Sequence, residues 1–353
     1  MRTPPLDMAV AYNERTAETE DQAERLREEY VEGIVDALRR LGHRAYALEV
    51  SGAPAEVFRR VAEARPDLVF NLAEGQGGAW REAFCPMLYG FLGLPYTGAG
   101  PGILGLGLDK RLTEEALALR GVAVPRGALV TPEAPDIPDA LRYPLLVKPN
   151  FEGSSMGIHQ GSVVQDTATA RRRIDDMLEA YPDGLDVEEF IEGREITVGY
   201  VEGLRERFTA PVEYRFPEGR EPIMDYETKM AKGAEAAVTT FCPAPLGTRE
   251  REAVLDTAAR AVSAMRLPDL GRVDLRLRAD GRVFLIEVNP LPGLRRISPL
   301  VVGARAQGHG YDDVIGAIVG TAARRHGLTD GSGPSGPATE AARPLGLAEA
   351  HSR

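Results

Sequence analysis

Two hydrophobic patterns alternate along the first hundred residues. Short apolar runs at 8–12, 45–50 and 67–72 predict buried strands. Between the first two runs, apolar side chains recur at helical spacing with charges between them, and Gly42 supplies a stop. This apolar face consists of Ala23, Leu26, Tyr30, Ile34, Leu38 and Leu41. Strands alternating with helices predict a small parallel sheet covered by helices.

The pattern changes after residue 105. Helices are predicted at 112–119 and 249–265, and a strand at 143–148. Strand-like runs at 185–191 and 195–201 flank a turn signal at Glu192–Gly193. The tail at 327–353 is small, polar and proline-rich, so we expect it to have no fixed structure.

A hairpin is predicted at 271–293, GRVDLRLRADGRVFLIEVNPLPG, because two alternating runs flank Asp280 and Gly281, a preferred two-residue turn. With that turn, Asp274 lies opposite Glu287 and Arg272 opposite Asn289, all four on one face. The other face would carry Val273, Leu275, Ile286 and Val288. A longer turn would shift this register.

Two carboxylates directly opposite each other repel, so they need a cation between them. Mg²⁺ suits Asp274 and Glu287 because it takes carboxylate oxygens together with substrate phosphates. Asn289 adds a neutral oxygen, and Arg272 adds a fixed cation for a carboxylate or phosphoryl oxygen. The alternative is an exposed hairpin face with ordinary charges, as Arg276 and its neighbour Arg278 suggest.

A glycine-serine loop follows the strand that ends near Lys148, in LLVKPNFEGSSMGI. Such a loop can close over phosphates with backbone N–H groups and hydroxyls, while the lysine supplies charge. It lacks the spacing of a Walker loop, and alone it is equally typical of a surface hairpin. Lys110 and Lys229 are weak signals singly, since most lysines are solvated. The acidic residues Glu188, Glu189 and Glu195 are either acceptors for adenine and ribose or an exposed acidic face.

Composition narrows the class of protein. With 353 residues, about two or three domains are expected. The net charge of −11 argues against a general nucleic-acid partner, which needs clustered lysine and arginine. The cysteines, Cys85 and Cys242, lack metal-ligand spacing and are expected to be buried thiols. Neither a secretion signal nor a membrane span is predicted, so a cytoplasmic enzyme fits.

Together these motifs resemble the D-alanine–D-alanine ligase family of the ATP-grasp superfamily, from about residue 65 to about residue 315. The matching stretches are LGLPYTGAG (92–100), LDKRLT (108–113), PLLVKPNFEGSSMGI (144–158), VEEFIEGREITVG (187–199), DYETK (225–229), FCPA (241–244), GRVDLRL (271–277) and LIEVNPLPGL (285–294). The resemblance implies an α/β (α+β) ATP-grasp fold. Its expected parts are an N-terminal parallel-sheet domain (1–104), a central flap domain with the glycine-serine loop (105–200) and a C-terminal mixed-sheet domain with the metal site (201–326).

The resemblance also implies roles for individual residues. ATP would be held by Lys110, Lys148, Ser155, Glu188, Glu189, Ile191, Glu195 and Lys229, with Glu195 on the ribose. Mg²⁺, or alternatively Mn²⁺, would be held by Asp274, Glu287 and Asn289. Arg272, Ser154 and Gly293 would act in catalysis, and Ser298 would hold the second substrate's carboxylate.

Four departures concern the amino-acid pockets. The stretch VAYNERTAE replaces the usual glycine-rich loop with its glutamate, and 70–84 lacks the usual histidine. Met230 follows Lys229 where an aromatic residue is usual, and Pro299 stands where leucine is usual. We therefore expect retained ATP and metal sites with altered substrate pockets, so that the substrates need not be two D-alanines.

The resulting hypothesis is an ATP-dependent ligase that joins two amino acids through an acyl phosphate. Its partners would be small amino-acid substrates, and a homodimer is left open. A cell-wall role follows by family analogy, with dipeptide synthesis in specialised metabolism as the alternative. Two other classes remain: an ATP-binding module without ligase activity, and a small-molecule kinase on the same fold.

Overall fold

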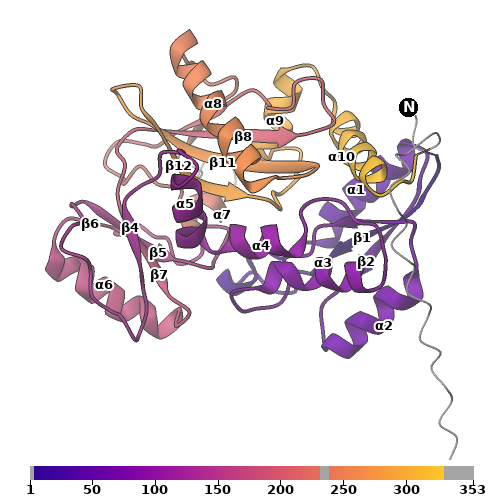
Figure 1. The fold of residues 1–353 in the computed structure, drawn as a ribbon, viewed down its shortest axis with the longest axis horizontal. Coiled ribbons are helices and arrows are strands. Elements are labelled where there is room, and N and C mark those ends of the chain that lie inside the picture. The colour runs from indigo at the N-terminus through magenta and orange to yellow at the C-terminus, as the bar shows by residue number, and fades with distance from the viewer. Residues whose placement is uncertain (1–3, 231–237, 330–353) are drawn as a thin grey trace, which may run out of the picture.

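The computed structural model describes residues 4–230 and 238–329. Residues 330–353, nearly all of the predicted tail, therefore lie outside the described part of the chain. The strands and helices predicted from the hydrophobic pattern are all present, and they form three sheets (Figure 1). Among the described residues, no helix combines the length and the apolar character needed to cross a membrane.

The N-terminal sheet is parallel, as predicted. Strand β1 (Asp7–Tyr12) lies between β2 (Arg44–Glu49) and β3 (Leu68–Asn71). Because the strands run the same way, their carboxyl ends share one edge of the sheet. The loops 13–27 and 72–80 leave the sheet at that edge, next to the rest of the molecule (Figure 1).

Helices cover both faces of this sheet and so bury its alternating side chains. The first face packs against α1 (Glu28–Arg40) and α10 (Tyr311–Arg325). The second packs against α2 (Pro54–Ala64) and α3 (Arg81–Phe91). The predicted helix begins only at Glu28, so Ala23 and Leu26 lie in the preceding loop.

The central sheet has the order β4-β7-β5-β6 and is antiparallel. Its strands are β4 (Gly127–Val130), β5 (Leu145–Pro149), β6 (Val163–Val164) and β7 (Leu185–Glu189). One face packs on α6 (Thr167–Ala180) through Leu145, Val147 and their neighbours. Since side chains alternate along a strand, Leu146 and Lys148 of β5 face the other way.

The C-terminal sheet has the order β10-β9-β8-β11-β12. A mixed sheet was expected, but every pairing in it is antiparallel. Its strands are β8 (Arg194–Val201), β9 (Val212–Arg215), β10 (Thr239–Phe241), β11 (Leu270–Leu277) and β12 (Val283–Asn289). Its helices are α7 (Tyr226–Met230), α8 (Thr248–Met265) and α9 (Pro299–Ala306).

The turn signal at Glu192–Gly193 joins two sheets and does not close a hairpin. Strand β7 pairs with β4 and β5, whereas β8 pairs with β9 and β11. A Cβ on Gly193 would lie 2.5 Å from the Leu277 carbonyl oxygen, so the crossing chain needs glycine there. The boundary predicted at residue 200 falls near the end of β8, and the division into domains stays a prediction.

Two further helices connect the N-terminal sheet to the other two. Helix α4 (Pro101–Leu108) packs on α3, and α5 (Lys110–Ala118) follows it directly. Asp109 separates them and caps α5 by accepting a hydrogen bond from the Leu112 N–H at 3.0 Å. This sharp junction directs Lys110, the first residue of α5, toward the space between the sheets.

Candidate active site

The β11–β12 hairpin brings the predicted carboxylates together, but by a different route from the one expected. Its turn has three residues, 279–281, because the Arg278 N–H donates to the Arg282 carbonyl at 2.9 Å. The longer turn shifts the register by one, so Leu275 pairs with Leu285. A bulge next to Asp274 then shifts it back. Asp274 therefore lies opposite Glu287, and Arg272 opposite Asn289, as predicted.

The bulge changes the surroundings of Ile286. This residue was expected on the apolar face of the hairpin, with Val288. Instead it is the extra residue between the two registers and lines the cavity beside the carboxylates. The two deviations, a longer turn and a bulge, cancel at the site and leave one more apolar side chain facing it.

Cations surround both opposed carboxylates. Arg272 donates to Asp274 at 2.8 Å, and the Thr197 hydroxyl donates to Asp274 at the same distance. Lys110 lies 3.3 Å from Glu287. Burial favours the neutral acid, but Lys110 and Arg272 outweigh it and lower the pKa of Glu287 to about 2. Glu287 is therefore ionised at neutral pH, the state that a metal ligand requires.

These oxygens fit Mg²⁺ chemically. Asp274 and Glu287 are hard carboxylate ligands on adjacent strands, and both line one cavity. Asn289 is less directly placed: its side-chain oxygen accepts from the Leu291 N–H at 2.9 Å, and it lines the neighbouring cavity. Two acidic clusters elsewhere also have metal-like spacing, Glu114–Asp186–Glu188 and Glu24–Glu74–Glu82.

Lys148 lies in the first of those clusters. Its side chain is 3% exposed, and its ammonium group is 2.8 Å from Glu188 and 3.3 Å from Asp186. Burial opposes the charge, but these carboxylates and Glu114 raise the pKa of Lys148. The burial of Glu188 rules out an exposed acidic face at this position, and its carboxylate is already paired.

Glu195 and Arg276 form a second buried pair. They are neighbours across β8 and β11, and the guanidinium of Arg276 donates to Glu195 at 2.9 Å. Arg276 is 5% exposed, so the expectation of an ordinary surface charge is wrong for it, although it holds for Arg278. Glu189 points elsewhere: it accepts from the Arg142 N–H at 3.0 Å and does not line the cavity.

The glycine-serine loop lies between the N-terminal layer and the two other sheets. The Glu152 carbonyl accepts from Lys110, and the Gly157 N–H donates to Glu20 at 2.7 Å. Ser154 and Ser155 have φ values of 50° and 61°, the left-handed region that non-glycine residues rarely occupy. Such strain persists where the surroundings enforce it, as at ligand-binding loops.

Two adjoining cavities contain nearly all the predicted site residues. The first, of about 210 Å³, is lined by Lys110, Lys148, Ser154, Ser155, Glu188, Ile191, Glu195, Lys229, Arg272, Asp274 and Glu287. The second, of about 170 Å³, is lined by Asn289, Gly293 and Ser298. Five residues line both and form a shared wall: Gly153, Ser154, Lys229, Arg272 and Glu287.

Several lining residues were not predicted from the sequence. Arg276, Phe190 and Tyr214 line the first cavity, and Glu24, Glu74, Glu82, Tyr30 and Arg295 line the second. For Glu74 a signal existed, since it lies three residues after the end of β3, at the carboxyl edge of a parallel sheet. For Glu24 no local pattern distinguishes it from the other glutamates between residues 14 and 32.

Comparison with known proteins identifies the family. Residues 131–320, more than half of the chain, match the family model for the D-ala D-ala ligase C-terminus. The D-alanine–D-alanine ligase of Sphingopyxis alaskensis is 31% identical over 293 residues, covering 81% of this chain and 90% of that protein. The chain belongs to the D-alanine–D-alanine ligase family. The resemblance seen in the motifs is thereby confirmed.

One further relative and two solved structures are also similar to this member of the D-alanine–D-alanine ligase family. Uncharacterized protein y4sG of Sinorhizobium fredii is 30% identical over 300 residues, covering 84% of this chain and 88% of that protein. The D-alanine–D-alanine ligase of Bacillus anthracis complexed with ATP matches with a TM-score of 0.73 at 19% identity, covering 92% of this chain and 99% of that one. VanG D-Ala:D-Ser ligase from Enterococcus faecalis matches with a TM-score of 0.69 at 19% identity, covering 90% and 99%.

These likenesses confirm the predicted ATP-grasp fold. D-alanine–D-alanine ligases form C–N bonds at the expense of ATP, and the family uses ATP with Mg²⁺.

Proposed function

We propose that this protein joins two amino acids by activating the carboxylate of the first as an acyl phosphate. One observation carries the proposal: Asp274 and Glu287 face each other at the junction of two cavities, with Lys110 and Arg272 beside them. A phosphoryl donor and a carboxylate acceptor held in separate but adjoining cavities would meet at this shared wall.

ATP is proposed to occupy the first cavity. Apolar side chains at one end, Leu146, Phe190 and Ile191, suit the adenine ring, and Glu195 suits the ribose hydroxyls. Lys110, Lys148 and Lys229 offset the phosphate charge, while Ser154 and Ser155 donate from the loop above. Glu188 supports this site indirectly, because its carboxylate accepts a hydrogen bond from Lys148. Glu189 ends β7, next to Phe190 and Ile191, which are proposed to contact the adenine.

Mg²⁺ is proposed to lie on Asp274 and Glu287, with Asn289 as a further oxygen ligand and Mn²⁺ as an alternative ion. When bound, the ion would supply positive charge that offsets the charge of the phosphates. Arg272 already contacts Asp274 at 2.8 Å, so it can keep that carboxylate oriented. The same guanidinium lines both cavities, where it can stabilise negative charge on the group being transferred.

The reaction then proceeds in two steps. An oxygen of the first substrate's carboxylate attacks the γ-phosphorus, and ADP leaves. The amine nitrogen of the second substrate attacks the acyl carbon and loses a proton, and inorganic phosphate leaves. Arg272, Ser154 and the backbone at Gly293 are placed to stabilise the oxyanion, and Ser298 to hold the second carboxylate. The loop over both cavities keeps water from hydrolysing the acyl phosphate.

The substrates are proposed to be amino acids, because relatives carry the name D-alanine–D-alanine ligase. Glu24, Glu74 and Glu82 line the second cavity, and this acidic lining supports a dipeptide product other than two D-alanines. Both a cell-wall role and dipeptide synthesis in specialised metabolism are compatible with this site. A cytoplasmic location is in keeping with ATP as a substrate and with two free cysteines.

The decisive experiment measures ADP release from purified protein with Mg²⁺, ATP and a panel of D- and L-amino acids. Mass spectrometry of the products separates a ligase, which makes a dipeptide, from a kinase, which makes ADP without needing an amine. Glu287→Gln should abolish amine-dependent ADP release, because it removes an ionised ligand. Glu179→Gln, an exposed position on α6, should retain wild-type turnover. Near-wild-type activity of Glu287→Gln would refute the assignment.

A further inference from the structure

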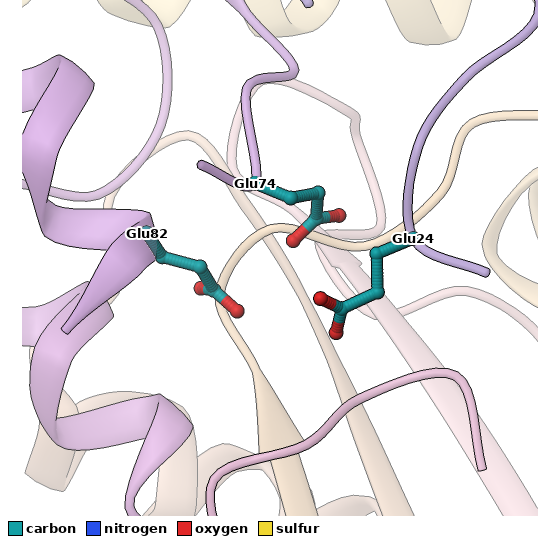
Figure 2. A group of neighbouring side chains, drawn as sticks. All are labelled: Glu24, Glu74 and Glu82. Carbon is teal, nitrogen blue, oxygen red and sulfur yellow. The ribbon is translucent and has the colours of Figure 1, made fainter. Parts of the chain in front are cut away.

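Three glutamates converge in the second cavity, on the side formed by the N-terminal layer. Figure 2 shows the carboxyl groups of Glu24, Glu74 and Glu82 pointing toward a common centre. Oxygens of all three lie within 4.8 Å of one another. Glu24 and Glu74 come from loops that leave the carboxyl edge of the parallel sheet, and Glu82 comes from the first turn of α3. We name these residues the acidic triad.

The backbone around Glu74 is held in place by specific contacts. The Gly75 N–H donates to the Asn13 side chain at 2.7 Å, which ties the loop after β3 to the end of β1. A Cβ on Gly75 would lie 2.3 Å from the Arg81 carbonyl oxygen, and its φ is 85°. Only glycine fits at position 75. Because it has no side chain, the loop can approach the start of α3 closely, and this brings Glu74 and Glu82 together.

Glu24 differs from the other two members because its charge is compensated. Arg81 donates to the same oxygen of Glu24 at 2.7 and 3.0 Å, and both side chains are at most 10% exposed. The other oxygen faces Gly153 of the glycine-serine loop, where a Cβ would lie only 2.0 Å away. The acidic triad is therefore fixed against the loop that covers both cavities.

Glu74 and Glu82 have no such compensation. Within residues 4–230 and 238–329, neither carboxylate forms an ion pair or accepts a hydrogen bond. Glu82 is only 7% exposed, and its carboxyl group faces the cavity. A buried carboxylate without donors is costly, so a ligand that brings N–H groups and positive charge would be bound strongly here. Burial and the Glu24 carboxylate raise the pKa of Glu82 to about 8, and a cation bound beside it would favour the ionised carboxylate.

We propose that the acidic triad selects a first substrate with a cationic side chain, a basic amino acid carrying an amine or guanidinium group besides its α-amino group. This inference rests on the proposed ligase function. The reacting carboxylate must lie at the shared wall, beside Arg272 and Lys229. With its carboxylate there, the same substrate would place its α-amino group and its side-chain amine or guanidinium beside the acidic triad. Alanine offers one ammonium group and a methyl group, which would leave one of the two uncompensated carboxylates without a partner.

A divalent metal ion is a weaker occupant for the same place. Glu24 already accepts two hydrogen bonds from Arg81, whose guanidinium would repel a divalent ion about twice as strongly as a singly charged organic cation. An ammonium or guanidinium group needs no full coordination shell and can bridge two carboxylates with short charge-assisted hydrogen bonds. The arrangement therefore favours an organic cation.

The test compares basic amino acids with neutral analogues of equal length. ADP release is measured with D- and L-arginine, lysine and ornithine, and with citrulline, norleucine and norvaline, using a panel of D- and L-amino acids that includes D-alanine as the second substrate. We expect kcat/KM to be about tenfold or more higher for the basic member of each pair. Glu82→Gln should remove this preference, mainly by raising KM for the basic acid. Glu56→Gln, an exposed glutamate on α2, should preserve it.

Each result separates the two proposals. Equal or better activity with neutral acids, unchanged in Glu82→Gln, overturns the role of the acidic triad but leaves the ligase intact. If no acid supports amine-dependent ADP release, the ligase proposal fails. Calorimetry with arginine and lysine in the presence of Mg²⁺ and ADP then tests the acidic triad directly. Binding that Glu82→Gln abolishes supports it, whereas no binding, or Mn²⁺ binding that depends on Glu82, overturns it. Glu82→Asp retains the charge and should recover part of the binding.

Discussion

At the scale of single residues, contacts with the adjacent strand distinguish a buried arginine from an exposed one. Arg276 and Arg278 occupy similar positions two residues apart in GRVDLRLRA, where alternation predicts the same face for both. Arg276 lies beside β8, where Glu195 and the face of the Phe190 ring surround its guanidinium. Arg278 lies past the end of the strand and is 44% exposed in its side chain. Their sequence context is nearly identical, but their environments are not.

This contrast predicts different effects for one substitution at two positions. Arg276→Met should lower the free energy of unfolding by about 2–3 kcal/mol, because Glu195 loses its charged donor within the cavity. Arg278→Met removes only an exposed ion pair with Asp280 and should change it by less than about 0.5 kcal/mol. Urea denaturation of both variants measures the difference. Equal effects would mean that the Arg276–Glu195 pair adds nothing to stability.

The residues that could be predicted from the sequence lie within one local element or one motif. Asp274 and Glu287 share a hairpin, so alternation brings them near each other, and the unpredicted bulge restores the predicted pairing after the longer turn. The members of the acidic triad are separated by up to 58 positions, from Glu24 to Glu82. Only the parallel packing of β1 and β3 brings their loops together. Periodicity carries no information about such contacts.

At the scale of elements, the glycine-serine loop depends on the segment that precedes α1. Gly157 is bound by Glu20, and Gly153 leaves room for the carboxylate of Glu24. Arg81 adds a third contact by donating to the Phe151 carbonyl at 2.8 Å. The loop over the cavities is therefore positioned from outside its own sheet, by residues that the hydrophobic pattern assigns to a helix and a connecting loop.

A small change in this loop should therefore act on catalysis more than on folding. Gly153→Ala forces the loop and Glu24 apart, since the new Cβ would lie 2.0 Å from a carboxylate oxygen. We expect kcat/KM for ATP to fall about tenfold or more, because small displacements of positioning groups are costly in rate. Steady-state kinetics with varied ATP measures this effect.

The matched control is Gly102→Ala in α4, where a Cβ meets nothing within 4 Å. Alanine is the better helix former, so this variant should keep full activity and unfold no more easily than the parent. Wild-type kinetics in Gly153→Ala would show that the loop accommodates the methyl group without moving.

The hairpin shows how far the prediction of an element can succeed. Its two strands and most of its apolar face, Val273, Leu275 and Val288, follow from alternation. The three-residue turn does not, because Asp280–Gly281 also serves as the end of a longer turn in which Gly281 has a φ of 83°. The compensating bulge depends on contacts with the cavity, which no pattern within the strand encodes.

At the scale of the whole molecule, the buried carboxylate of Asp269 connects the segment around Gly98 to α10, the last helix. Asp269 precedes β11 and is 1% exposed. It accepts from the Gly98 N–H at 2.8 Å and from Arg325 of α10 at 2.6 Å. Arg325 also donates to the carbonyls of Tyr96 and Gly98. Three distant parts of the chain thus meet at one side chain.

Removing its charge should loosen this junction. Asp269→Asn keeps the size of the side chain, and asparagine tolerates the left-handed backbone found here, with φ at 59°. We expect the free energy of unfolding to fall by about 2–3 kcal/mol through the lost charged hydrogen bonds. Asp256→Asn, which removes an exposed pair with Arg260 within α8, should cost about 0.5 kcal/mol or less. Thermal denaturation measures the difference. Equal losses of stability in the two variants would argue against a special role for Asp269.

The wall common to both cavities has a consequence for inhibition. Since Gly153, Ser154, Lys229, Arg272 and Glu287 line both cavities, the proposed nucleotide and amino-acid sites adjoin at these five residues. A single tethered compound, with a nucleoside at one end and an amino-acid mimic at the other, could occupy both spaces at once. Its second half would bind as an intramolecular event, at a high effective concentration. Such a compound would contact the acidic lining of the second cavity with its amino-acid end and the lysines of the first cavity with its nucleotide end.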